Sequence, residues 1–446
     1  MTTYFAEGSP TTELTDDQMR AALQATLAAR GQPRRVLALP PDFTRYYSRA
    51  GDLTVIAYEQ LGERLVDVMP ALGTHFPMPA EQLEKMFPGI PHSLIREHKW
   101  REDVITIGEV PADTVSQATA GIWKKPWPAQ LNKLLWEGGH DLILSIGQVV
   151  PHEVIGMANY NKNIFVGTGG VQGINQSHFI GAAYGMERMM GRADTPLRRM
   201  LNYAQDNFCQ HLPLVYVLTV IGENEAGKLC VRGLFIGDDV DCYERACELS
   251  IEVNFKLLDH EFTKVVCYMD PAEYHSTWIG NKALYRTRMA IADDGELVIL
   301  APGVKTFGED PQIDVLIRKY GYRTTPEVMR SVDENDDLAN SLGPAAHLIH
   351  GSSEGRFTVT WCPGHLSREE VEGVGYDYGD CGQMMQRYDP TQLRDGWNTL
   401  PDGERIYFIS KPALGLWAYR GRFALTARRI AQQPRVFSVS LFELQS

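Results

Sequence analysis

The chain has 446 residues, of which 44% are hydrophobic, 22% charged and 10% aromatic, a globular composition that excludes a disordered or fibrous chain. This length exceeds that of a typical domain with a single hydrophobic core. It predicts two domains, with three as the alternative. The formal charge of −13, from 43 basic and 56 acidic side chains, argues against a nucleic-acid partner, because proteins of that class present a basic face.

The sequence also predicts where the protein works. Its first residues lack the basic and apolar segments of a secretory signal, and no apolar run approaches the ~18 residues of a membrane span. The seven cysteines are scattered and never form a CxxC pair, which favours reduced thiols over disulfides or a cysteine metal site. We therefore expect a cytoplasmic protein without a membrane partner.

Helical and strand patterns alternate through the first part of the chain. In chain order we predict a helix at 16–29, a strand at 35–39, a helix at 54–65, a strand at 66–72, a mixed region at 114–137, a strand at 142–146, paired strands at 214–221 and 229–236, and a helix at 242–255.

Strands of a second sheet follow at residues 262–269, 297–300, 357–361 and 405–409. This alternation favours an α/β fold of two domains with mainly parallel sheets and an active-site cleft between them. We place the boundary at residue 258. Residues 1–258 then form an N-terminal domain with the catalytic and cofactor motifs, and residues 259–446 form a C-terminal domain that completes the substrate cleft.

Polar side chains follow each of the first three predicted strands. Asp42, Thr44 and Arg45 come after the first strand, His75 after the second and His152 after the third. Ligands of open parallel sheets bind beyond the carboxyl ends of the strands, so these side chains are expected at one edge. Two histidines can act there as general acid and base, and an arginine can grip a carboxylate with two hydrogen bonds.

Each of these residues also has a purely structural explanation. A single histidine near a strand end more often bonds a loop than catalyses a reaction. Asp42 and Arg45 could be a helix cap and a surface ion pair. The functional interpretation depends on their convergence, not on any one of them.

The segment from residue 151 to 179 places a single lysine, Lys162, among small, apolar and amide side chains. In a dry setting its pKa would fall and its amine would serve as a nucleophile or covalent anchor; otherwise it is a solvated loop lysine. His178 could ligate a metal. Gly167 and the glycines after it could let backbone amides approach a phosphate, although GTGGVQG matches no standard fingerprint.

These residues resemble the motifs of the nickel-dependent lactate racemase family, in order and at matching spacing over the first ~200 residues. The family's Asp-x-Thr-Arg motif matches residues 42–45, and its Gly-x-His-x-Pro turn matches residues 73–77. Its histidine, tether lysine, glycine and nickel-binding histidine match His152, Lys162, Gly167 and His178. The chain departs from the family before the lysine, where residues 158–161 read Ala-Asn-Tyr-Asn in place of Ser-Gly-Gly-Arg.

The resemblance implies an isomerase that inverts the C2 centre of a 2-hydroxy acid by reversible hydride transfer. It implies a nickel-pincer nucleotide (pyridinium-3,5-bisthiocarboxylic acid mononucleotide nickel) tethered to Lys162, with His178 as the metal ligand. Asp42, Thr44 and Gly167 would contact this cofactor. His75 and His152 would be the catalytic acid and base, and Arg45 would hold the substrate carboxylate.

The substrate is expected to contact the segment 274–289, where Lys282 is the nearest match to the family's substrate lysine, together with Trp278, Tyr285 and Arg286. The many polar side chains of this segment favour a polyhydroxylated sugar acid such as gluconate as the substrate. The structural alternative is that half of these side chains lie on the exposed surface of a helix.

Other functions stay open at this stage. One is racemisation of lactate or another short 2-hydroxy acid. A second is a zinc- or iron-dependent hydrolase or aldolase without the pincer, and a third is a solute- or cofactor-binding carrier. The expected partners are the small-molecule substrate and cofactor-synthesis proteins, and a homo-oligomeric state stays open.

Overall fold

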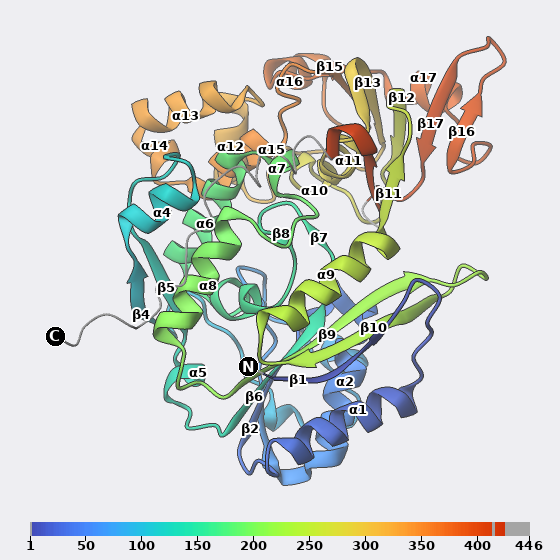
Figure 1. Ribbon diagram of the computed structural model, residues 1–446. Helices are drawn as coiled ribbons and strands as arrows, with labels where there is room; N and C mark the ends of the chain where they lie inside the picture. The colour runs from blue at the N-terminus through green and yellow to red at the C-terminus, as the bar shows by residue number, and fades with distance from the viewer. Residues whose placement is uncertain (1, 413–414, 424–446) are drawn as a thin grey trace. The chain divides into compact units, whose positions relative to one another are not determined.

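The computed structural model describes residues 2–412 and 415–423, which divide into two compact units (Figure 1). Of these residues, unit 1 comprises 2–177 and 191–253, and unit 2 comprises 178–190 and 254–423. None of the helices in the described part of the chain is long and apolar enough to cross a membrane.

Unit 1 is built on a six-stranded sheet of order β1-β10-β9-β6-β2-β3. The strands β9, β6, β2 and β3 are parallel, while β10 and β1 add an antiparallel edge. The strand bounds are β1 Thr3–Gly8, β2 Val36–Leu39, β3 Leu65–Val68, β6 Leu142–Gln148, β9 Leu214–Glu223 and β10 Leu229–Gly237. Two antiparallel pairs stand apart from this sheet: β4 Val104–Val110 with β5 Trp127–Asn132, and β7 Pro151–His152 with β8 Gly156–Met157.

The core of unit 1 explains why its central strands read as continuous apolar runs. All four residues of β2 are buried, and the side chains of Val36 and Ala38 join those of β6, α1 and α2 in one cluster. Parallel strands covered on both faces need such runs rather than alternation. The helices of this unit are α1 Asp16–Ala29, α2 Ala50–Leu61, α3 Ala80–Met86, α4 Ala112–Ala118, α5 Lys133–Glu137, α8 Pro196–Phe208 and most of α9 Val240–Asn254, while α6 Val171–Tyr184 begins here and continues into unit 2 at His178.

Unit 2 contains a second six-stranded sheet of order β15-β14-β13-β12-β17-β16, parallel except for β16 against β17. Its strands are β12 Phe262–Tyr268, β13 Ile291–Ala301, β14 Thr358–Pro363, β15 Asp377–Tyr378, β16 Gly396–Thr399 and β17 Arg405–Ile409, with a separate parallel pair of β11 Phe255–Leu258 and β18 Leu416–Tyr419. Its helices are α7 Met186–Met189, α10 Thr277–Gly280, α11 Lys282–Thr287, α12 Pro311–Tyr320, α13 Thr325–Glu334, α14 Asp336–Ala339, α15 Leu342–His350, α16 Arg368–Gly373 and α17 Cys381–Arg387.

The predicted α/β class with mainly parallel sheets is confirmed. The helix predicted at 16–29 has those bounds, because Thr15 and Gln18 form a capping box at its start. The helix predicted at 54–65 instead runs from Ala50 to Leu61 and ends at Gly62, whose φ of +57° favours glycine. The mixed region at 114–137 holds α4, β5 and α5.

Candidate active site

The first group of predicted site residues meets beyond the end of β2. Asp42 is buried and caps a short 3-10 helix, Phe43–Ser48, where its Oδ1 accepts from the backbone N–H of Thr44 at 3.1 Å and from the Thr44 hydroxyl. The other oxygen of the same carboxylate, Oδ2, lies 2.5 Å from Nδ1 of His75. The acid and the histidine, predicted from different strands, are therefore hydrogen-bonded partners.

The neighbouring strands β2 and β3 bring His75 to Asp42. Pairing continues past both strands, since the N–H of Ala71 donates to the carbonyl of Pro40 at 2.8 Å. A tight turn follows, in which the N–H of His75 donates to the carbonyl of Leu72 at 3.0 Å. The parallel register of two strands thus determines which side chains meet at their carboxyl ends.

The Asp42 contact indicates which nitrogen of the neutral His75 ring carries its proton. Burial opposes ionisation of Asp42, but the hydrogen bonds from His75 and Thr44 outweigh it and lower the pKa of this carboxyl below its ordinary 3.8. An ionised carboxylate only accepts hydrogen bonds, so the proton between the two groups belongs to Nδ1 of His75. The Nε2 lone pair of His75 is then available as a base, on a side chain that is 60% exposed.

Arg45 lies in the same 3-10 helix, at a residue whose φ of −112° and ψ of 28° break the helical geometry. Its side chain is half-buried, and its guanidinium makes no hydrogen bond or ion pair within residues 2–412 and 415–423. The ion-pair alternative for Asp42 and Arg45 is therefore wrong, since the carboxylate pairs with His75. A guanidinium without a carboxylate partner is suited to bind an anion.

The segment that carries Lys162 is attached to the end of β2 and to the middle of β6. The Asn163 amide donates to the carbonyl of Leu39, at the end of β2, and to the hydroxyl of Ser145 in β6, both at 3.0 Å. The residues after Lys162 form a π-helix, Asn163–Gly167, a geometry frequent at functional sites. Its last carbonyl, of Gly167, accepts from the N–H of Gly73 at 2.8 Å, next to the His75 turn.

Lys162 has a strongly perturbed pKa. Burial and the cations of Arg45 and Arg198 lower the pKa of its amine from the ordinary 10.5 to about 8, against the opposing charges of Glu153 and Asp42. The side chain is half-buried rather than solvated. A far larger fraction of this amine is neutral near pH 7 than in an ordinary lysine, and the neutral amine is the nucleophilic form.

His152 lies in the short strand β7 and is buried. Its Nδ1 accepts from the backbone N–H of Val154 at 3.1 Å, so the neutral ring carries its proton on Nε2. The two predicted catalytic histidines therefore have opposite tautomers in this structure.

Close packing accounts for the glycines after Lys162. A Cβ on Gly167 would lie 2.8 Å from Cβ of Ala71, one on Gly170 would lie 2.5 Å from Oε1 of Gln130, and one on Gly169 would overlap the carbonyl of Phe165. These residues need no phosphate to explain their lack of side chains.

His178 lies in α6, in the segment His178–Met190 that belongs to unit 2, and is half-buried. Among the residues that the structure describes, no three or more histidine, cysteine or acidic side chains are grouped as metal ligands.

The predicted substrate segment in unit 2 is mostly buried. Trp278 and Lys282 are half-buried, and Tyr285 and Arg286 are buried, as are the neighbouring residues Ser276, Thr277 and Asn281, so the helix-surface alternative is wrong.

One residue that the sequence did not single out, His347, contacts side chains of this segment. His347, buried in α15, lies 3.0 Å from the Tyr285 hydroxyl through Nδ1 and 2.9 Å from the Tyr322 hydroxyl through Nε2. Its ring packs on Trp278, with centroids 4.3 Å apart, and burial lowers its pKa to about 3. His347 is therefore a neutral anchor for two predicted substrate residues; a histidine on the apolar stretch of α15 was its only sign in the sequence.

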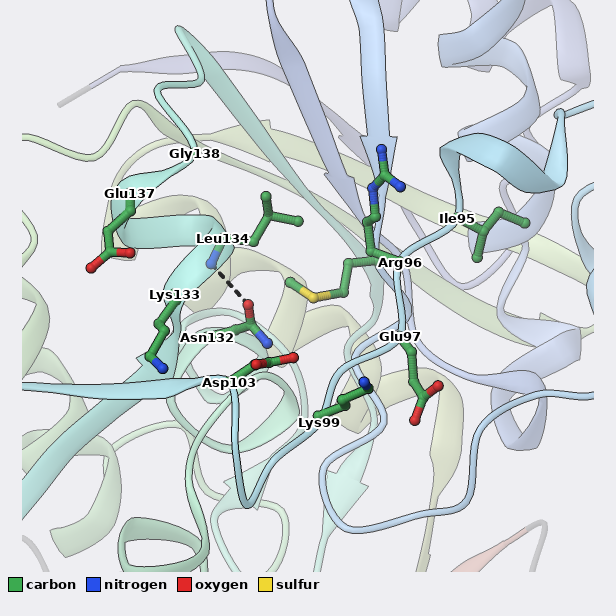
Figure 2. Close-up of a pocket in the computed structure, with 11 residues that line it drawn as sticks. Ile95, Arg96, Glu97, Lys99, Asp103, Asn132, Lys133, Leu134, Glu137 and Gly138 are labelled. Atoms are coloured by element: carbon green, nitrogen blue, oxygen red, sulfur yellow. Dashed lines mark hydrogen bonds between the residues drawn. The ribbon is translucent and has the colours of Figure 1, made fainter.

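A separate hollow of about 640 Å³ opens on unit 1 and contains none of the predicted site residues (Figure 2). Its charged walls carry both signs, with Arg96, Lys99 and Lys133 beside Glu97, Asp103 and Glu137. Asn132 in its wall bonds the buried His98 at 3.0 Å, and His98 bonds the carbonyl of Gly169 at 3.0 Å. Burial lowers the pKa of His98 to about 4, so this neutral histidine serves as a structural hydrogen-bonding residue.

Comparison with known proteins gives a fold and no sequence family. No family model and no curated protein sequence matches the chain. A crystal structure of a protein from Thermotoga maritima is 24% identical, covering 93% of this chain and 100% of that one, with a TM-score of 0.75. The lactate racemase apoprotein from Thermoanaerobacterium thermosaccharolyticum is 14% identical, covering 93% and 94%, with a TM-score of 0.67. The chain is therefore similar to lactate racemase in fold, as the motifs predicted.

Proposed function

We propose that this protein is a racemase or epimerase that inverts the C2 centre of a 2-hydroxy acid, with a nickel-pincer nucleotide attached to Lys162. The observation that carries the proposal is the Lys162 amine, whose pKa of about 8 suits covalent attachment, placed beside Arg45 at the ends of the central strands. The similarity in fold to lactate racemase supports the same reaction class.

Arg45 holds the substrate in this proposal. Its guanidinium has no partner within the described residues, and a planar guanidinium can donate two parallel hydrogen bonds to a carboxylate. Fixing the carboxylate fixes the neighbouring C2 and its hydroxyl, which is the group that must lose a proton.

His75 is the base. Its Nε2 takes the hydroxyl proton, and the Asp42 carboxylate at Nδ1 stabilises the resulting positive charge on the ring. His152 presents Nε2–H and donates a hydrogen bond to the substrate oxygen. It becomes a full proton donor only when Nδ1 is also protonated, which breaks its contact with the Val154 N–H. Inversion requires a proton acceptor on one face and a donor on the other, which these two residues provide.

The residues present suit the cofactor. When bound, the nickel-pincer nucleotide supplies the acceptor and donor of the C2 hydride. Lys162 would hold it covalently, and His178 would provide a nickel ligand, with Asp42, Thr44 and Gly167 near the attachment point. A cofactor that brings its own sulfur donors to the metal needs few protein ligands, which is compatible with a site that lacks a cluster of three among the described residues.

We propose a polyhydroxylated sugar acid, such as gluconate, as the substrate. Lys282, Tyr285 and Arg286 would contact its hydroxyls, and Trp278 would line the site. Thr277 bonds Tyr322 at 2.7 Å and Asn281 accepts from Tyr376 at 3.1 Å, so these two side chains are engaged within the protein. A short acid such as lactate is the alternative.

Peptide mass spectrometry of the protein co-expressed with cofactor-synthesis proteins tests the attachment. The wild type is expected to carry a nickel-containing adduct on the peptide of Lys162, and Lys162→Ala is expected to lose both adduct and activity. Lys228→Ala, at an exposed turn, is the control that retains both. An active preparation with unmodified Lys162, or zinc or iron without an adduct, contradicts the proposal. NMR with gluconate as a single epimer and chiral chromatography with lactate as a single enantiomer then identify the substrate class.

A further inference from the structure

The loop that leads into Lys162 has an unusual backbone. Asn159 and Tyr160 have φ values of 62° and 57°, in the left-handed region that side chains other than glycine rarely adopt. Two such residues in succession persist only where the surrounding structure holds them. The structure therefore needs a residue that fixes this loop.

Arg198 makes three contacts to that loop. It projects from α8 and is 2% exposed. One guanidinium nitrogen donates to the carbonyl of Met157 at 2.8 Å and to the carbonyl of Asn159 at 3.2 Å, while the other donates to Oδ1 of Asn161. The amide of Asn161 in turn donates to Asn202 at 2.7 Å, one turn further along α8.

An aromatic wall completes the support. The ring of Tyr160 stacks on Tyr243, with centroids 5.0 Å apart and an interplanar angle of 15°, and lies 4.3 Å from the ring of Tyr216. The guanidinium of Arg198 lies 4.4 Å from the centre of the Tyr243 ring. The strained residue Tyr160 and the arginine are thus held by the same side chain.

The charge of Arg198 is not neutralised by an acid. Its contacts are with carbonyl and amide oxygens and an aromatic face, and no carboxylate forms an ion pair with it among the residues described. Its Nε is buried without a hydrogen-bond partner. A buried arginine that serves packing alone is normally paired, because an unpaired buried charge is costly. The oxygens of the loop and the Tyr243 ring therefore provide the contacts of this cation.

We infer that Arg198 is a positioning residue for Lys162, which fixes the loop of residues 157–161 and thereby keeps the lysine amine in its dry, nucleophilic setting. The use of a nucleophilic amine at Lys162 rests on the proposed function. The contacts between Arg198 and the loop are independent of that proposal.

The test measures the titration of Lys162 in the full chain without cofactor. Isotope-labelled acetic anhydride is applied across pH 6 to 11, and the labelled fraction of the Lys162 peptide is read by mass spectrometry. The wild type is expected to show a midpoint at about 8. In Arg198→Met the midpoint should move toward an ordinary lysine's, ~10.4, lowering labelling at pH 8 by up to ~100-fold. Part of that change comes from the charge of Arg198, which lowers the pKa of Lys162 directly. Arg198→Lys keeps the charge and loses the fork, so its midpoint should still lie above that of the wild type if the fork positions the loop.

Arg199→Met is the matched control, because Arg199 is the next residue of α8 and pairs with Asp194 at 2.7 Å instead of the loop. Its Lys162 midpoint should equal that of the wild type. A folded Arg198→Met with the wild-type midpoint overturns the inference. Should that variant not fold, Asn161→Ala decides: a raised midpoint supports the inference, and an unchanged one refutes it. Suppose that the variants show a raised Lys162 midpoint but that Lys162 is unmodified in the active wild type co-expressed with cofactor-synthesis proteins. This result would contradict the proposed function and leave the role of Arg198 supported.

Discussion

Replacing Lys162 with methionine should stabilise the protein. Burial and the Arg45 cation lower the pKa of Lys162 from 10.5 to about 8. At ~1.36 kcal/mol for each pH unit, keeping this lysine protonated in the fold costs about 3 kcal/mol relative to the unfolded chain. Methionine has a similar length and carries no charge, so Lys162→Met should raise the free energy of unfolding by about 3 kcal/mol at pH 7.

The sign of the pH dependence follows from proton binding. Below pH 8 the folded and unfolded chains both carry the proton, and the cost is full. Between about 8 and 10.5 the unfolded chain binds more protons than the folded chain, so wild-type stability rises with pH, and above 10.5 the cost is gone. The advantage of the variant should therefore shrink over this window.

Urea denaturation of wild type and variant without cofactor, at pH values from 6 to 10.5, measures the difference directly. Other titrating groups cancel between the two proteins. Lys228→Met, at an exposed turn, should match the wild type throughout. Two results would contradict this prediction. One is that Lys162→Met and the wild type have the same free energy of unfolding at pH 7, and the other is that the difference between them is the same at pH 7 and pH 10.

Three further predictions concern catalysis by the holoenzyme. Asp42→Asn should lower kcat by ~10–100-fold in steady-state epimerisation, because the charge-assisted bond to His75, worth ~1.5–3 kcal/mol, becomes neutral; an unchanged kcat argues against His75 as the base. Arg45→Lys loses the planar fork and should lower turnover by ~10-fold or more; wild-type activity would remove this arginine from the substrate site. His75→Ala and His152→Ala should each abolish net epimerisation. In rapid-mixing absorbance, each variant should still reduce the cofactor with one epimer, whereas reduction by the other epimer should be slower by ~10²–10⁴-fold. Full racemisation by both variants would refute the two-histidine mechanism.

The sequence by itself determined the elements whose patterns are local. The capping residues Thr15 and Gln18 lie three positions apart, so the start of α1 could be read directly. The apolar run of β2 identified a buried parallel strand, since such strands need apolar side chains on both faces. Because parallel strands end at a common edge, the meeting of Asp42 with His75 could also be expected, and the structure places them 2.5 Å apart.

Only the tertiary structure decided how these residues are supported. Asn159 and Tyr160 adopt left-handed backbone without glycine, a conformation that no local pattern indicates. Arg198, which holds this loop, donates to a carbonyl 41 residues away in the sequence, and His347 contacts Tyr285 across 62 residues. Such contacts depend on which helices pack on which loops, and the low pKa of Lys162 depends on the burial that this packing produces. Residue types and spacing therefore predicted the candidate site residues, whereas the packing around them determined their tautomers, their burial and their backbone strain.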